Sequence, residues 1–272
     1  MTTIAAIHFG HSHLAAGIPF LYNRELATDK TGKAIEHYVF DVYNNRNIFH
    51  QDETKLHYGI IEGGRILFNP ELLDRVRARI APDREIVYIS TFGGNAHNAL
   101  TLLHSARAYD FILPSEPDLL VDDNLELIPH AAVHDAIEHN CKNFLLDLEG
   151  LRNSVDADVY HVISPPTIQN DALVGEIVAN DTILAQTGTL VTASLTRYKA
   201  WRVHSEIFAA KCEQIGAKVL YPPSSAMKDD MWLAEDCIGG DPTHGNLSYY
   251  GLMFQEIEKT LGGHFAGWDF IR

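Results

Sequence analysis

Short apolar runs alternate with longer stretches of helical periodicity along the chain. The short runs are rich in β-branched and aromatic residues and stop at Gly, Pro or polar turn residues, as buried strands do. They predict strands at residues 3–9, 35–43, 85–91, 159–164 and 218–221.

Apolar residues at helical spacing predict helices between these strands. Asn69 is suited to cap the first of them, and Pro70 to open it. Gly216 is suited to end a later one. The predicted helices cover residues 70–80, about 129–152, about 193–215 and about 247–261.

Strands that alternate with helices of this length are typical of a parallel sheet covered by helices on both faces. We therefore expect a single domain over residues 1–272, with the flavodoxin-like, three-layer α/β/α sandwich and a mainly parallel central sheet. An acidic stretch that includes PSEPDLLVDDNLELIP predicts a helical or irregular insertion at about 107–156.

Charge and composition narrow the classes of partner. The chain carries 21 basic and 36 acidic side chains, a net charge of −15, which repels phosphate backbones and anionic lipid surfaces. Nucleic acid and membrane surfaces are therefore not expected partners. Three dispersed cysteines suggest no disulfide framework, and no secretory leader or membrane-spanning run is recognisable. A cytoplasmic location is the expectation.

Four short segments carry candidate chemistry: GHSH at 10–13, EGGR at 62–65, GGNAH at 93–97 and DPTH at 241–244. Ser12 and Asn95 each fall just after a predicted strand end. Because ligands bind outside the carboxyl ends of parallel strands, both residues are expected at the same, ligand-binding edge of the sheet.

DPTH and Ser12 together have the residue types of an activated serine nucleophile. Serine is a weak nucleophile until a base takes its proton, and histidine suits that role. Ser12 is thus the candidate nucleophile, His244 its base and Asp241 the carboxylate that orients the base. Alone, each segment has a simpler interpretation, since Asp241 or Thr243 could cap a helix and GGN could be an ordinary turn.

The order of these segments resembles that of the SGNH hydrolase superfamily, or GDSL-type esterases. Gly10-His11-Ser12 looks like the GDS block, Gly93-Gly94-Asn95 looks like the GGN block, and Asp241-Pro242-Thr243-His244 matches D-x-x-H before a last helix. Gly64, or its neighbour Gly63, is the nearest match to the glycine block, and Ser164-Pro165-Pro166 is similar to the family's Pro-containing turn. His11 and Ala96 depart from the pattern, because the family usually has Asp at both positions.

The resemblance implies a serine-dependent hydrolase that cleaves an acyl ester of a small molecule or carbohydrate, with O-acetyl or short-chain groups as the candidate acyl, and needs no cofactor. An O-acyltransferase acting on a carbohydrate with the same residues, or a non-catalytic binding domain, are the alternatives. The implied oxyanion donors are the N–H groups of Ser12 and Gly64 and the side chain of Asn95. Histidines that could line the substrate pocket are His11, His13 and His97.

A metal-dependent phosphoesterase is the rival hypothesis for the histidine-rich first segment. His8, His11 and His13 form HxxHxH, and histidine is the commonest metal ligand. In calcineurin-like phosphoesterases, however, G-H-x-H comes last, and carboxylates that bridge two metals are placed before it. The sequence has the opposite order and lacks those carboxylates, so no metal is expected.

Overall fold

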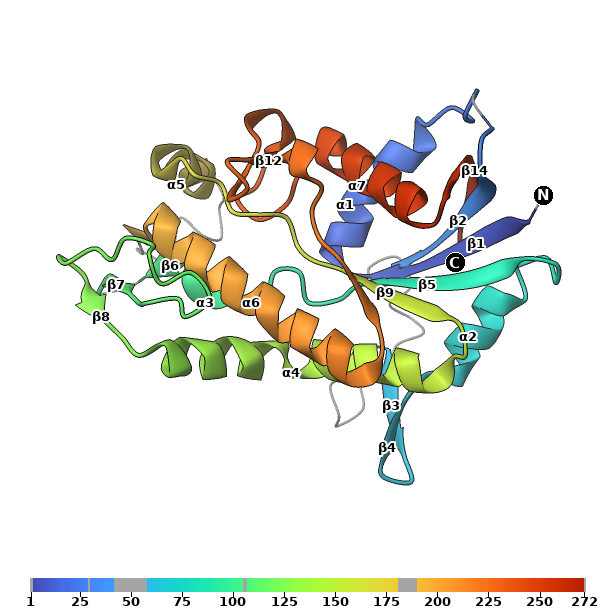
Figure 1. The fold of residues 1–272 in the computed structure, drawn as a ribbon, viewed down its shortest axis with the longest axis horizontal. Helices are drawn as coiled ribbons and strands as arrows, with labels where there is room; N and C mark the ends of the chain where they lie inside the picture. The colour runs from blue at the N-terminus through green and yellow to red at the C-terminus, as the bar shows by residue number, and fades with distance from the viewer. Residues whose placement is uncertain (1, 29, 42–57, 105–106, 181–189, 272) are drawn as a thin grey trace.

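Among the residues that the structure describes, the central sheet has six strands, all parallel, in the order β11-β9-β5-β1-β2-β14 (Figure 1). The computed structural model describes residues 2–28, 30–41, 58–104, 107–180 and 190–271. The sheet strands are β1 (Thr3–Gly10), β2 (Lys33–Asp41), β5 (Glu85–Thr91), β9 (Asp158–Val162), β11 (Lys218–Leu220) and β14 (Gly263–Phe270).

Five of these strands are the predicted ones, and the last two positions of the predicted second strand, 42–43, lie outside the described residues. The sixth strand, β14, was not predicted. It lies at the edge of the sheet beside β2, and Phe265 is its only buried residue. An edge strand with so little burial has no apolar run by which to recognise it.

Helices connect the strands as predicted, and Asn69 caps α2 by accepting a hydrogen bond from the Glu71 N–H. Gly216 takes the left-handed conformation at the end of α6. The helices are α1 (Ser12–Tyr22), α2 (Pro70–Arg77), α3 (Asn98–Thr101), α4 (His130–Ser154), α5 (Asp171–Asn180), α6 (Ser194–Ile215) and α7 (Leu247–Thr260). Among the described residues, 3-10 turns lie between α6 and α7, at Ser224–Ala226 and Glu235–Cys237.

Alternating side chains of β1 build two cores, one on each face of the sheet. Ile4 and Ala6 pack with α1 and α7, whereas Ile7 and Phe9 pack with α2, α4 and α6. Figure 1 shows the same division, with α1 and α7 above the sheet and α2, α4 and α6 below it. The structure is therefore the three-layer α/β/α sandwich, with the flavodoxin-like strand order extended by β14.

The predicted insertion at 107–156 has two parts of different character. Its first part is irregular and contains the short paired strands β7 (Tyr109–Asp110) and β8 (Glu126–Leu127). Its second part is α4, whose Ile137, Cys141 and Leu148 are fully buried in the core beneath the sheet. The helix is thus a layer of the sandwich and not an addition to it.

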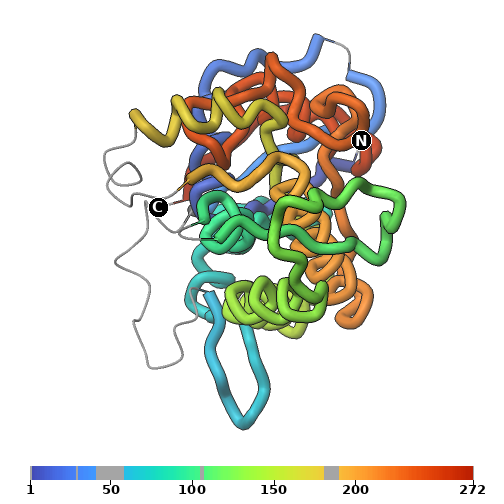
Figure 2. The backbone as a smooth tube through the Cα atoms, turned by 90° about the vertical axis from the view of Figure 1, so that its left-hand side faces the viewer, coloured from blue at the N-terminus to red at the C-terminus, as the bar shows by residue number. Residues whose placement is uncertain are grey.

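Short paired strands complete the elements. β3 (Gly59–Glu62) and β4 (Arg65–Phe68) form a hairpin that projects from the α4 side of the molecule in both views (Figure 2). The remaining pairs are β6 (Leu103–His104) with β10 (Leu190–Val191), and β12 (Met227–Lys228) with β13 (Trp232–Leu233). Within the described part of the chain, no helix is both long and apolar enough to cross a membrane.

A buried ion pair ties the irregular segment to α6. The Lys199 ammonium donates to both carboxylate oxygens of Asp110, at 2.8 and 2.9 Å, and to the Leu120 carbonyl at 2.9 Å. The two side chains are 0% and 3% exposed. Because both charges lie away from water, the attraction between them offsets the free energy that each loses by leaving water.

Removing one partner of this pair should cost far more than removing one partner of a surface pair. Asp110→Ala leaves the Lys199 charge buried without its counterion, and we expect the free energy of unfolding to fall by about 3–5 kcal/mol. Asp158→Ala is the matched control, because its pair with Lys218 is 56% and 53% exposed and should contribute less than about 1 kcal/mol. Urea unfolding of both variants measures this; equal losses would contradict the expectation.

Buried histidines make the fold sensitive to acid. Burial lowers the pKa of each, to about 3 for His13 and His161 and to about 4 for His204. The same cause lowers the pKa of His8, His37 and His97. The unfolded chain therefore binds protons near pH 6.5 that the folded chain does not bind until the pH is much lower.

Stability should accordingly fall as the pH decreases from about 7 to about 5. Each buried histidine contributes a slope of up to about 1.4 kcal/mol per pH unit, because the unfolded state takes up more protons in this range. Urea unfolding at both pH values measures the difference. An unchanged or higher free energy of unfolding at the lower pH would show that the buried rings are protonated in the folded state.

Candidate active site

The register of β1 against β5 places the GHSH and GGNAH segments side by side. Gly10, the last residue of β1, is opposite Thr91, the last residue of β5. Helix α1 starts at Ser12, and the turn with Asn95 follows β5. Both residues therefore emerge at one edge of the sheet, as the strand pattern predicts.

Two glycines permit the close contact between these segments. A Cβ on Gly10 would lie 1.9 Å from Thr91 Oγ1 and 2.7 Å from Leu14 Cβ, so a larger residue would push β1, β5 and α1 apart. A Cβ on Gly94 would lie 2.2 Å from Cδ2 of the His13 ring. The GGN turn thus packs directly on His13.

The DPTH segment lies in the loop before α7 and is held by its own aspartate. Asp241 Oδ1 accepts hydrogen bonds from the N–H groups of Thr243 and His244, at 2.8 and 3.0 Å, and from the Thr243 hydroxyl at 2.8 Å. His244 Nδ1 lies 2.9 Å from both oxygens of the same carboxylate. Asn246, and not Asp241 or Thr243, caps α7.

The Asp241 carboxylate is held in its ionised form. Partial burial opposes ionisation, but the hydrogen bond and charge of His244, together with the bonds from Thr243, outweigh it and lower the pKa of Asp241 well below its ordinary value. An ionised carboxylate only accepts hydrogen bonds, so His244 Nδ1 must carry a proton. In neutral His244, Nε2 is then the acceptor nitrogen, which is the tautomer that a general base requires.

Asn95 connects His244 to His13. Its Nδ2 lies 3.4 Å from His244 Nε2, and its Oδ1 lies 2.7 Å from His13 Nε2. The His13 and His244 rings also contact each other, with centroids 4.4 Å apart. On the other side of His13, the Tyr250 hydroxyl lies 3.4 Å from Nδ1. Three of the four segments singled out from the sequence, GHSH, GGNAH and DPTH, therefore meet in one contact network.

Ser12 is partly exposed at the first position of α1, next to His13 in the chain. Its side chain forms no hydrogen bond with any residue that the structure describes, and His244 Nε2 faces the Asn95 amide. The proposed nucleophile is thus adjacent in the chain to His13, whose ring contacts His244, and it is not hydrogen-bonded to the proposed base. Catalytic hydrogen bonds often form fully only when a substrate is bound.

Gly64 is not brought to this site. Gly63 and Gly64 form the two-residue turn of the β3–β4 hairpin, with φ of 58° and 78°. Both are exposed, and apart from the adjacent residues in the chain no described atom lies within 4 Å of where their Cβ atoms would be. The hairpin projects on the side of α4, opposite α1 and α7 (Figure 1). The assignment of Gly64, or of Gly63, as an oxyanion donor is therefore corrected: two glycines here form a hairpin turn, where left-handed φ angles are needed.

The three histidines predicted to line a pocket have different surroundings. His13 contacts the Asp241–His244 pair through Asn95. His97 is 1% exposed and packs on His204, with ring centroids 4.6 Å apart, so it is a core residue in this structure. His11 packs edge-on against aromatic rings of Tyr58, Phe92 and Phe144. Of the three, only His13 lies at the candidate site.

Thr243 and Tyr250 belong to the network but were not predicted. An aspartate side chain in a turn commonly accepts a hydrogen bond from the backbone N–H two residues later, so the contact of Thr243 with Asp241 had a local signal. Tyr250 had none, because its contact with His13 joins positions 237 residues apart. Burial and the nearby Asp241 charge raise the pKa of Tyr250, so its hydroxyl keeps its proton.

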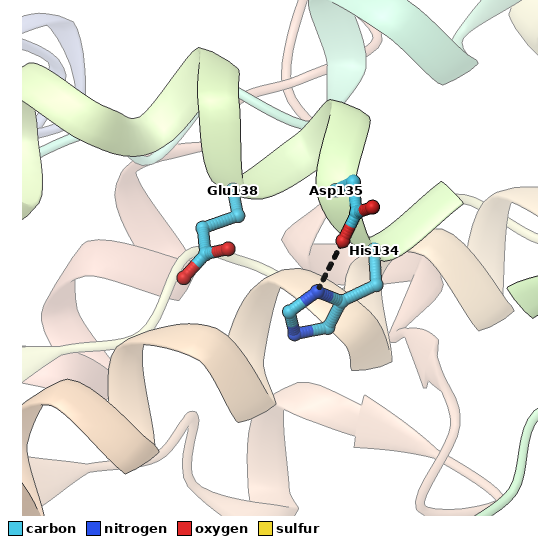
Figure 3. Close-up of side chains that lie close together, drawn as sticks. All are labelled: His134, Asp135 and Glu138. Carbon is cyan, nitrogen blue, oxygen red and sulfur yellow. Dashed lines mark ion pairs between the residues drawn. The ribbon is translucent and has the colours of Figure 1, made fainter. Parts of the chain in front are cut away.

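A group of potential metal ligands lies elsewhere, on α4 (Figure 3). Ligand atoms of His134, Asp135 and Glu138 lie within 4.8 Å of one another, and Asp135 and Glu138 are exposed. His134 Nδ1 forms an ion pair with Asp135 at 3.6 Å. Because α4 lies beneath the sheet and α1 and α7 lie above it, this group is separate from the candidate active site.

Comparison with known proteins gives remote structural similarities only. No protein-family model matches the chain, and no curated protein sequence matches it significantly. A gut microbial diltiazem-metabolizing enzyme has a TM-score of 0.43 at 12% identity; the match covers 95% of this chain and 46% of that protein, so this chain spans less than half its length. A carbohydrate acetylesterase from Sinorhizobium meliloti has a TM-score of 0.39 at 8% identity, covering 95% and 98% of the two chains.

The periplasmic domain of a lipopolysaccharide acetyltransferase from Salmonella ser. Paratyphi A has a TM-score of 0.37 at 13% identity, and the match covers 95% of this chain and 84% of that one. Similarity this remote does not assign a function.

Proposed function

We propose that the protein is an SGNH-type serine hydrolase that cleaves acyl esters. The observation that carries this proposal is the Asp241–His244 pair at 2.9 Å, which leaves His244 Nε2 as a proton acceptor beside the Asn95 amide. This acceptor lies at the edge of the sheet where Ser12 begins α1. Nucleophile, base, orienting carboxylate and amide donor are the parts that serine-dependent acyl transfer requires.

In the proposed reaction, the Ser12 hydroxyl turns to His244 Nε2 and replaces the long contact from Asn95 at 3.4 Å. Ser12 Oγ attacks the ester carbonyl carbon while its proton passes to Nε2. Asp241 stabilises the imidazolium through Nδ1–H. The released Asn95 Nδ2–H and the Ser12 N–H at the start of α1 then donate to the oxyanion, whose negative charge the helix N-terminus favours.

Collapse of the tetrahedral intermediate breaks the bond to the alkoxy oxygen, which takes the proton from His244 and leaves as the alcohol. Water then attacks the carbonyl carbon of the acyl-Ser12 ester and gives a proton to His244. The bond to Ser12 Oγ breaks, His244 returns the proton to Oγ, and the carboxylic acid leaves. We propose an ester of a small molecule or a carbohydrate as the substrate. The net charge of −15 disfavours polyanionic substrates.

A fluorophosphonate probe should label Ser12, because it reacts with serines that a nearby base activates. Tryptic mass spectrometry locates the label. Ser12→Ala should remain unlabelled, whereas Ser248→Ala, a change of a serine at the start of α7, should be labelled like the native protein. Absence of label on the native protein, next to a labelled control esterase, would refute the proposed nucleophile.

Asp241→Asn should lower kcat for p-nitrophenyl acetate by about 10³–10⁴-fold, because an amide N–H facing Nδ1 moves the histidine proton to Nε2 and removes the base. Asparagine retains an oxygen for the Thr243 and His244 N–H groups, so the loop should keep its shape. Asp236→Asn makes the same charge change in the preceding turn and should leave kcat unchanged. Similar rates for native protein and Asp241→Asn would exclude Asp241 from the mechanism.

A further inference from the structure

We infer that His13 is the residue that positions the oxyanion donor: its imidazole holds the Asn95 side chain so that Nδ2 faces the reacting atoms. The inference rests on the proposed function, in which Asn95 Nδ2 stabilises the oxyanion. His13 itself does not contact the reacting atoms in this role and acts only through Asn95.

The direction of the Asn95 amide follows from Asp241. That carboxylate requires a proton on His244 Nδ1, so neutral Nε2 only accepts hydrogen bonds. The atom of Asn95 that faces Nε2 must therefore be the donor, Nδ2, and Oδ1 must face His13. A reversed amide would oppose Oδ1 to the lone pair of His244 and would present an acceptor to the oxyanion.

His13 has the proton arrangement that this amide direction needs. Nε2 lies 2.7 Å from Asn95 Oδ1 and must donate, so Nδ1 of the neutral ring accepts from the Tyr250 hydroxyl at 3.4 Å. Each contact in the series from Tyr250 to Asp241 then joins one donor to one acceptor. Burial and the neighbouring His244 lower the pKa of His13 to about 3, so the ring stays neutral and this arrangement persists at neutral pH.

Packing holds the His13 ring in place. The side chain is 6% exposed, contacts the His244 ring and lies directly against Gly94, which has no Cβ to displace it. The hydrogen bond to Asn95 is also the shorter of the two that the ring makes. The ring is therefore a rigid support for an amide that would otherwise have two orientations of similar shape.

A double-mutant cycle separates positioning from a general structural effect. Asn95→Ala should lower kcat for p-nitrophenyl acetate by about 10²–10³-fold, the usual effect of losing one oxyanion donor, with a smaller change in KM. His13→Leu should lower kcat toward the same level. Because His13 acts through Asn95, adding Asn95→Ala to His13→Leu should cause little further loss. Where turnover is too slow, the rate constant for fluorophosphonate labelling of Ser12 replaces kcat.

Two variants serve as controls. His13→Gln keeps an N–H close to the position of the imidazole Nε2 and should restore most of the activity lost in His13→Leu. His97→Leu makes the same change at another buried histidine of this region, one whose ring nitrogens have no hydrogen-bond partner among the described residues, and should leave kcat unchanged.

The outcomes distinguish this inference from the proposed function. If native Ser12 is labelled but the effects of the two substitutions multiply, or if His13→Leu retains full activity, His13 does not position Asn95 and the proposed hydrolase stands. If His97→Leu loses as much activity as His13→Leu, the loss is a packing effect and the inference fails. If native Ser12 is not labelled, the proposed function fails and the inference fails with it.

Discussion

The parallel pairing of β1 between β2 and β5 is the constraint on which the candidate site depends. Gly10, Asp41 and Thr91 end their strands at the same level, so all three connections leave from one edge. Hydrophobic burial selects this register of the strands. A slip by one residue would move Ile4 and Ile7 to the opposite faces of the sheet, and neither core would then be filled by its own side chains. Accurate placement of Ser12 relative to Asn95 is therefore a consequence of hydrophobic burial far from either residue.

Within the site, one ionised carboxylate orders the protons of several side chains. Asp241 directs the proton of His244, which directs the amide of Asn95, which in turn directs the imidazole of His13. Each group in this series is at least partly buried. A single charge kept in place by its own loop can thus establish donor and acceptor roles across three segments that are distant in sequence.

The spacing of apolar residues along the sequence predicted much of this architecture, because the buried face of a helix or strand requires apolar residues at regular intervals. The helix at Pro70–Arg77, with its Asn69 cap, and the strand at Glu85–Thr91 show this. Where few side chains are buried, as in β14, the sequence has no such regular spacing. Gly63-Gly64 shows a different difficulty: the same dipeptide suits a hairpin turn and an anion-binding turn, and only the surroundings decide. Contacts such as that of Tyr250 with His13 arise from tertiary packing, and the residues near either position in the sequence do not predict them.

Strand β14 has a consequence for how the chain is made. It is the outer neighbour of β2, yet more than 200 residues separate the two in sequence. Until β14 emerges from the ribosome, β2 has an open row of backbone donors and acceptors beside buried side chains such as Ile35, Val39 and Phe40. An open edge of this kind pairs readily with other chains, so the nascent chain carries an aggregation hazard while the residues between β2 and β14 are made. In the finished fold the outermost strand at this end of the sheet is β14, which has only one buried residue.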